Sequence, residues 1–170
     1  EKHFHELGAG AHVTLAGTRV AVNDRSFHHP GNSWGYKASR DGCSVVYATD
    51  AEFKKPEPNM MGFAHEWLQG VDLLIFDSQY TFAEAMDKRD WGHCSSLIGV
   101  DLCVAHAVRT LAIFHHEPNY DDEKIVELLN RTIEYRDKLH TPGGLPEVIV
   151  AREGAIVDLA RKGASGVRRA

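Results

Sequence analysis

The sequence predicts an α/β fold, of the α+β kind, in which helices cover a mixed β-sheet. Three observations lead to this prediction. The chain opens with short β-type runs joined by tight turns, and it then alternates buried apolar runs with helical segments. An apolar content of 43% over 170 residues is enough for one core. Because no internal repeat or low-complexity segment divides the chain, residues 1–170 are interpreted as a single domain.

The first half of the chain is expected to form four strands, at residues 12–15, 19–22, 34–38 and 44–49. Gly17 provides the turn between the first two strands. Asp41-Gly42 is a strong hairpin signal between the other two, because this pair adopts the backbone conformation that tight turns need. Pro56 and Pro58 then interrupt the chain before an expected helix near residues 60–69.

The second half is expected to form strands at residues 71–76, 110–114 and 147–151, with helices at 95–110 and 121–139. The first of these strands is continuously apolar, as is typical of a strand buried on both faces. The helices are indicated by apolar residues at helical spacing. Pro142 ends the second helix, and a short last strand is expected after Gly154.

Charge and cysteine usage exclude several classes of protein. The net charge is −5 with both signs interspersed, so no basic patch indicates nonspecific nucleic-acid binding. The basic residues near the end, Arg161, Lys162, Arg168 and Arg169, are interpreted as a solvated tail. Three cysteines without CxxC spacing favour neither a disulfide framework nor a thiolate zinc site, and they predict a reducing, cytoplasmic setting.

The ends of the chain carry two further expectations. No apolar run approaches the roughly 20 residues of a membrane span, and no signal-peptide pattern opens the sequence, so no membrane association is expected. The chain begins at Glu1 rather than Met, which indicates a processed, trimmed or partial polypeptide.

Histidines and carboxylates stand at the ends of strand-like runs. His28 and His29 precede one run, and three others are followed by Asp50, by Asp77 and by His115-His116. His93 opens an expected helix. Polar groups at strand ends converge over one edge of a sheet, and imidazole and carboxylate ligands suit zinc, manganese or iron. A lone histidine is more often structural, but so many at strand ends favour a metal-hydrolase site.

These residues also carry a family resemblance. The chain resembles the C-terminal half of the metallo-β-lactamase fold hydrolases through five segments in this order: HHPGNSWGYK, VVYATDAE, LLIFDSQYT, WGHCSS and LAIFHHEPNY. The match is to the phosphodiesterase branch that includes tRNA 3′-endonuclease Z and the cyclic phosphodiesterase of phosphonate breakdown. It covers about residues 4–154. The implied fold is half or more of an αββα sandwich.

The resemblance implies a role for each of five residues. His29, Asp50 and His115 correspond to metal ligands, with Asp50 as the carboxylate that bridges two metals. His93 corresponds to the histidine that meets the scissile phosphate as proton donor or charge stabiliser, and Asp77 to the acid that orients it. The implied cofactors are two divalent metal ions, zinc before manganese or iron. They would activate a hydroxide that attacks a phosphodiester.

The neighbours of these residues are given other roles. His28 and His116 are not assigned as ligands. Ser95 and Ser96 leave two interpretations open: they either contribute to an anion site at a helix N-terminus or simply cap the helix.

The chain departs from the family in one respect, because the metal motif HxHxDH is absent. His3 and His5 form an H-x-H, but no Asp-His follows, and we interpret them as coincidental. The missing N-terminal half is expected as another segment, another chain or a second copy in a homodimer. Without it, half of a sandwich would expose a broad apolar sheet face.

Three functions therefore compete. The first is a metal-dependent phosphodiesterase, for which the acidic net charge favours a small cyclic or linear phosphodiester over a large nucleic acid. The second keeps the fold but hydrolyses a lactone, a thioester or a β-lactam. The third is a degenerate or partial domain that acts as a binding or regulatory module.

Overall fold

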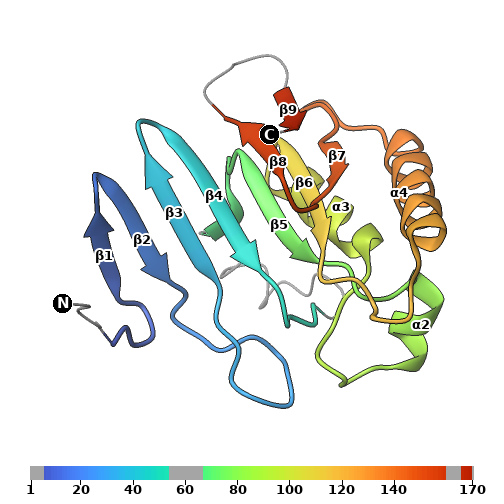
Figure 1. Cartoon of the computed structure of the whole chain (residues 1–170), viewed down its shortest axis with the longest axis horizontal. Helices are drawn as coiled ribbons and strands as arrows, with labels where there is room; N and C mark the ends of the chain where they lie inside the picture. Colours follow the sequence, from blue (N-terminus) through green and yellow to red (C-terminus); the bar gives the residue numbers. More distant parts are fainter. Residues whose placement is uncertain (1–5, 54–66, 160–165, 170) are drawn as a thin grey trace.

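The computed structural model describes residues 6–53 and 67–159, together with the backbone of 166–169. The expected helix near residues 60–69 falls mostly outside these ranges, as do His3 and His5. Within them, a seven-stranded sheet forms the centre of the molecule (Figure 1). None of the helices in the described part of the chain is long and apolar enough to cross a membrane.

The seven strands lie side by side in chain order: β1 (His12–Leu15), β2 (Thr18–Val22), β3 (Tyr36–Arg40), β4 (Cys43–Ala48), β5 (Leu73–Asp77), β6 (Thr110–Phe114) and β7 (Glu147–Val150). Strands β1 to β4 pair antiparallel, and β4 to β7 pair parallel. Parallel neighbours need crossover connections, which explains the helices between the later strands. The prediction of a mixed sheet with helices is confirmed.

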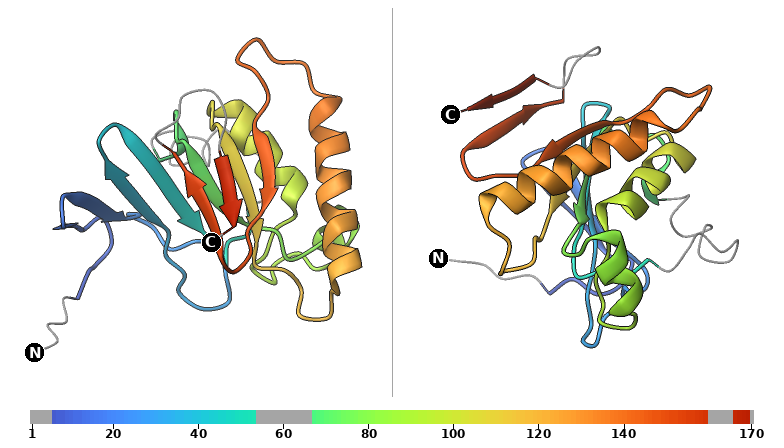
Figure 2. Two further views of the ribbon diagram at one scale, coloured as in Figure 1. Left: turned by 45° about the horizontal axis from the view of Figure 1, so that its top comes forward. Right: turned by 90° about the vertical axis from the view of Figure 1, so that its right-hand side faces the viewer.

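The described helices are α2 (Phe82–Asp87), α3 (Ser96–Ala105) and α4 (Asp122–Asp137). Figure 2 shows α2 and α3 on one side of the sheet, with the hairpin of β8 (Ala155–Asp158) and β9 (Gly166–Arg169) on the other. Asp121 caps α4 by accepting a hydrogen bond from the Lys124 N–H at 2.8 Å.

The core lies between the sheet and α3. Its fully buried side chains come from alternate positions of the central strands and from the inner side of the helix: Val46, Leu74, Phe76, Val100, Leu111 and Ile113. Gly99 allows the close approach, since a Cβ there would lie 2.8 Å from a ring carbon of Phe76. The carboxyl ends of β4, β5 and β6 are thereby held in a fixed arrangement.

The opposite face of the sheet is apolar and partly open to solvent. Tyr47 alternates with the core residues of β4 and therefore points away from α3. Tyr47 pairs with Tyr36, and both rings are substantially exposed, at 37% and 43%. Leu15 lies on the same face at the sheet edge and is 57% exposed. In the part of the chain that the structure describes, β8–β9 does not extend over this region (Figure 1).

Several sequence predictions are corrected. Strand β3 begins at Tyr36 and extends to Arg40, because its pairing with β4 continues up to the turn at Asp41-Gly42. Helix α2 was not predicted. Of the basic residues interpreted as a solvated tail, Arg168 and Arg169 belong to β9, which pairs with β8, and Arg161 and Lys162 lie outside the described residues. The backbone hydrogen bonds of that hairpin account for the difference.

Candidate active site

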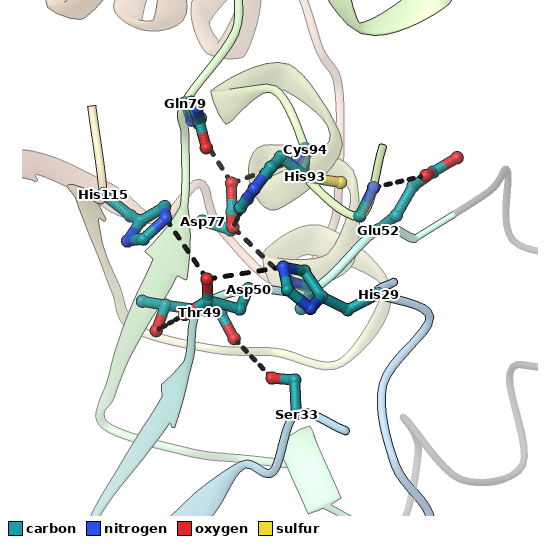
Figure 3. Close-up of polar contacts among 12 residues, drawn as sticks. His29, Ser33, Thr49, Asp50, Glu52, Asp77, Gln79, His93, Cys94 and His115 are labelled. Carbon is teal, nitrogen blue, oxygen red and sulfur yellow. Dashed lines mark hydrogen bonds and ion pairs between the residues drawn. The ribbon is translucent and has the colours of Figure 1, made fainter. Parts of the chain in front are cut away.

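The candidate site lies at the carboxyl ends of three parallel strands. Asp50 follows β4, Asp77 ends β5 and His115 follows β6 (Figure 3). The pairing of these strands aligns their ends, so side chains more than sixty residues apart in sequence meet at one edge. This is the edge at which open α/β sheets bind their ligands.

His29 reaches the same edge from the loop between β2 and β3. Asn23, which is completely buried, fixes both ends of this loop. Its side-chain oxygen accepts from the Gly35 N–H at 2.8 Å, and its own N–H donates to the Gly35 carbonyl at 3.1 Å. Further along the loop, the Ser33 hydroxyl donates to the Thr49 carbonyl at 3.2 Å. The loop that carries His29 is therefore bound to the end of β4.

Asp50 lies between two imidazoles. Its Oδ1 is 3.6 Å from Nε2 of His29 and 3.5 Å from Nε2 of His115. These separations are longer than ordinary hydrogen bonds. They are close to the roughly 3.4 Å expected between two ligand atoms on one tetrahedral zinc ion. Each Asp50–imidazole pair fits a shared divalent metal in both chemistry and spacing.

The backbone at two of these residues is in an uncommon conformation. Asp50 has φ +52° and His115 has φ +59°, in the left-handed region that residues other than glycine seldom adopt. Such conformations cost of order 1–3 kcal/mol and concentrate at functional sites. The surrounding structure therefore holds both side chains over the sheet edge at the expense of local stability.

His93 is oriented by Asp77. Nδ1 of His93 lies 2.9 Å from Oδ2 of Asp77, whose side chain is completely buried. An ionised carboxylate can only accept, so Nδ1 donates and Nε2 remains for other contacts. Asp77 also accepts from the backbone N–H of Cys94 at 3.0 Å and from that of Ala51 at 3.3 Å. One carboxylate thus joins the His93 loop to the loop that follows β4.

The electrostatic environment of His93 is mixed. Burial lowers the pKa of its imidazole. The hydrogen bond to Asp77, together with the negative charges of Asp77, Asp50 and Glu117, outweighs burial and raises the net pKa above the ordinary 6.5. The acidic residues around the site therefore favour the protonated ring.

The three imidazole rings are close together. His93 stacks on His115 with ring centroids 5.1 Å apart, and it meets His29 edge to face at 5.3 Å. Ligand atoms within 4.8 Å of one another form two groups: His29, Asp50 and His93, and Asp77, His93 and His115. The structure brings all five residues named from the sequence into one cluster.

Comparison with known proteins identifies the fold. No protein-family model matches the chain. The protein YhfI from Bacillus subtilis, described as a metallo-β-lactamase fold protein, superposes with a TM-score of 0.60 at 13% identity, over 86% of this chain and 50% of that one. The short form of human tRNase Z superposes with a TM-score of 0.53 at 15% identity, over 82% of this chain and 42% of that one. The chain has the metallo-β-lactamase fold.

A curated sequence relative agrees with this result. Ribonuclease Z of Synechococcus sp. (strain CC9311) is 30% identical over 117 residues, which are 69% of this chain and 32% of that protein. The chain thus spans about a third of this relative and about half of YhfI. It is a partial metallo-β-lactamase fold.

Within this metallo-β-lactamase fold, the two serines after His93 are structural. Ser95 occupies the N-cap position of α3, but its hydroxyl is buried and has no hydrogen-bond partner among the described residues. The Ser96 hydroxyl lies 2.6 Å from that of Thr132 in α4. Because both serines are completely buried, neither can meet a phosphate, and the anion-site interpretation is wrong for their side chains. The capping interpretation is correct only in part: Ser95 stands at the N-cap position, but its side chain makes no capping hydrogen bond.

His28 and His116, the chain neighbours of His29 and His115, are not part of the cluster. His28 turns away, and its Nε2 lies 3.0 Å from Oδ1 of Asp90. The ring nitrogens of His116 are buried, and burial lowers the pKa of this imidazole. Cys94 is adjacent to the site, but its buried sulfur contacts the backbone of Phe53, and burial raises the pKa of the thiol to about 12.

Sequence reasoning missed one residue at the site. Glu52 is 8% exposed, and its carboxylate accepts from the Gly92 N–H at 3.1 Å (Figure 3). Glu52, His28 and Asp90 also form a third group whose ligand atoms lie within 4.8 Å. The only signal in the sequence was the position of Glu52 two residues after Asp50, which does not distinguish a buried carboxylate from an exposed one.

Proposed function

We propose that the chain carries the carboxyl-terminal part of a metal-dependent phosphodiesterase site. The observation that carries the proposal is the position of Asp50 Oδ1 between the imidazoles of His29 and His115, beside a histidine bound to a buried carboxylate. A structural ion pair would bring carboxylate and imidazole to hydrogen-bonding distance. A metal cluster keeps them slightly further apart, as they are here.

His29, Asp50 and His115 would hold the metal, with Asp50 shared between two divalent ions, zinc before manganese or iron. Such a pair, when bound, neutralises charge on the phosphoryl oxygens and lowers the pKa of a water molecule towards about 7. The chain itself supplies the neutral imidazoles and the carboxylate that these ions require.

His93 would act on the phosphate side. With Nδ1 held by Asp77, its Nε2 can carry a proton, stabilise negative charge on the phosphoryl group and donate that proton to the leaving oxygen. Asp77 does not touch the substrate in this account. It fixes the tautomer and the ring orientation of His93, as carboxylates behind catalytic histidines do.

The substrate we propose is a small cyclic or linear phosphodiester. The name of the Synechococcus relative, Ribonuclease Z, supports a phosphodiester bond as the target. The net charge of −5 makes a large nucleic acid a less favourable partner, because binding a polyanion requires a basic surface.

Completion of the site would require the remainder of the fold. This chain covers half or less of YhfI, human tRNase Z and the Synechococcus relative, and one face of its sheet is open and apolar. We propose that a further segment, a separate chain or a second copy of this chain covers that face and adds metal ligands.

The proposal is tested by hydrolysis of bis(p-nitrophenyl) phosphate in the presence of zinc or manganese. Wild-type chain together with the remainder of the fold should turn over this diester, and His93→Asn in the same assembly should lose most of the rate while retaining metal. Glu134→Gln, a change at an exposed position on α4, serves as the control and should have no effect. Turnover of a β-lactam or a thiolactone but not of the diester would favour the second hydrolase function.

A binding or regulatory module is the second candidate. It is favoured by the short coverage of the relatives, since a domain that lacks part of its metal shell can retain the fold without activity. Elemental analysis of native protein distinguishes the two, because a module would contain no transition metal.

A further inference from the structure

Glu52 is a buried carboxylate that contacts two loops of the site at once. Its N–H donates to the His28 carbonyl at 3.1 Å, which binds the loop that carries His29. Its side chain accepts from the Gly92 N–H at 3.1 Å, which binds the loop that carries His93. Since Glu52 also follows Asp50 by two residues, it connects the loops that carry His29, Asp50 and His93.

Burying the Glu52 carboxylate costs free energy, which other interactions must offset. Only 8% of Glu52 is exposed, and moving a carboxylate out of water costs several kcal/mol unless hydrogen bonds or opposite charge offset it. The Gly92 N–H is one such partner, and Nε2 of His28 lies 3.9 Å from the same oxygen. An apolar residue would avoid the cost of burying the charge, so stability alone does not explain a hydrogen-bond acceptor here.

Gly92 links Glu52 to the imidazoles of His29 and His93. Gly92 has φ +89°, and a Cβ added to it would lie 2.5 Å from Cδ2 of His29 and 2.7 Å from Cδ of Pro30. The backbone at Gly92 therefore contacts the ring of His29 directly, and His93 is the next residue. Any shift of Gly92 moves both imidazoles, whose rings are only 5.3 Å apart.

We infer that Glu52 is a positioning residue. Through its hydrogen bond to Gly92, it sets the distance between the His29 and His93 rings. It thereby sets the distance between the metal ligand His29 and the histidine that would meet the phosphate. This inference rests on the proposed function in its use of His29 as a metal ligand. Asp77 performs a related task from the other side of the cluster, so two buried carboxylates hold the His93 loop.

The test compares three variants. Glu52→Ala removes the acceptor, whereas Glu52→Gln retains an oxygen that can accept from Gly92. Asp72→Ala is the matched control, because Asp72 is also buried and also accepts a backbone N–H, that of Ser44 at 2.8 Å, but at the opposite end of β5. Glu52→Ala and Asp72→Ala should both lower the melting temperature.

The first measurement is zinc affinity by competition with a chelator. Glu52→Ala should weaken binding by about 10-fold or more, as loss of a partner behind a metal ligand generally does. Glu52→Gln should recover most of the affinity, and Asp72→Ala should leave it unchanged. The positioning role would be excluded by wild-type affinity in Glu52→Ala, and also by an equal loss in Asp72→Ala, which would reveal a general effect of lost stability.

The second measurement uses metal-free protein and separates this inference from the proposed function. Glu52→Ala should accelerate hydrogen exchange of the Gly92 amide and shift the ring nitrogen resonances of His29 and His93, and Asp72→Ala should do neither. If wild-type protein bound no zinc, the proposed function would fail, while these shifts would still support the positioning role. Unchanged resonances and exchange in Glu52→Ala would overturn it.

Discussion

Nδ1 of His93 lies 2.9 Å from Oδ2 of Asp77, a carboxylate with no exposed surface. This contact joins the end of β5 to the loop before α3 and leaves one imidazole nitrogen free of the carboxylate. Because Asp77 also accepts three backbone N–H groups, those of Ala51, Gln79 and Cys94, its own position is fixed. The orientation of the His93 ring is therefore fixed, as the proposed proton transfer requires.

We expect Asp77→Asn to reduce diester turnover by about 10- to 100-fold with little change in metal content. An asparagine has nearly the same size but lacks the charge that holds the imidazole and favours its protonated form. Steady-state kinetics and elemental analysis on the same preparation measure both quantities. Loss of metal in parallel with activity would show that Asp77 is a ligand rather than an orienting residue.

The lowered pKa of Glu84 predicts that the free energy of unfolding depends on pH. Hydrogen bonds from the hydroxyls of Thr81 and Tyr120 lower its pKa from 4.5 to about 2. A depressed folded-state pKa adds stability above the unfolded-state pKa. The contribution of Glu84 should thus be complete above about pH 5 and lost as the pH falls towards about 2. The difference in free energy of unfolding between wild type and Glu84→Gln, followed by urea titration, should shrink over this range. A constant difference would contradict the hydrogen-bonded arrangement.

Gly99→Ala should destabilise the chain although alanine favours helix. Helix propensity contributes about 1 kcal/mol in favour of alanine, whereas overpacking a core costs about 1–3 kcal/mol. The added Cβ would lie 2.8 Å from Phe76 and 3.1 Å from Leu111, so we expect a net loss of about 1 kcal/mol in urea unfolding. Gly8→Ala is the control, because its Cβ would meet nothing within 4 Å. A stabilised Gly99→Ala would show that α3 packs less closely than described.

The open sheet face predicts association. With Leu15 and Tyr36 exposed on one side of the sheet, the chain without its complement should sediment as a species larger than one chain or bind an apolar dye. Leu15→Lys combined with Tyr36→Lys should reduce either signal. Val126→Lys, an equally exposed apolar position on α4, should not. A monomeric wild type without dye binding would indicate that this face needs no partner.

The sequence was sufficient to predict the parts of the fold that depend on hydrophobic pattern. The continuous apolar runs of β5 and β6 identify strands buried on both faces, and their polar end residues follow directly. Helix α2 was missed because it has only six residues. The sequence nevertheless contains a signal for the N-terminus of α2, since Thr81 and Glu84 form a capping box.

Other features of the site could not be predicted, because they depend on tertiary contacts. The left-handed backbone of Asp50 and His115 is only weakly indicated by residue type, because Asp and His adopt it more often than most residues but still uncommonly. The burial of Glu52 depends on the approach of Gly92, forty residues away. The burial of Ser95 and Ser96 follows from the packing of α3 on α4 rather than from their position after a histidine.

The central claim is that His29, Asp50 and His115 form a metal site, and the most direct test is the metal content of native protein and of Asp50→Ala, measured by elemental analysis after identical purification. The account predicts a bound divalent transition metal in the wild type that is lost in the variant, with a folded circular dichroism spectrum in both. A wild type without metal, or a variant that retains it in full, would contradict the account.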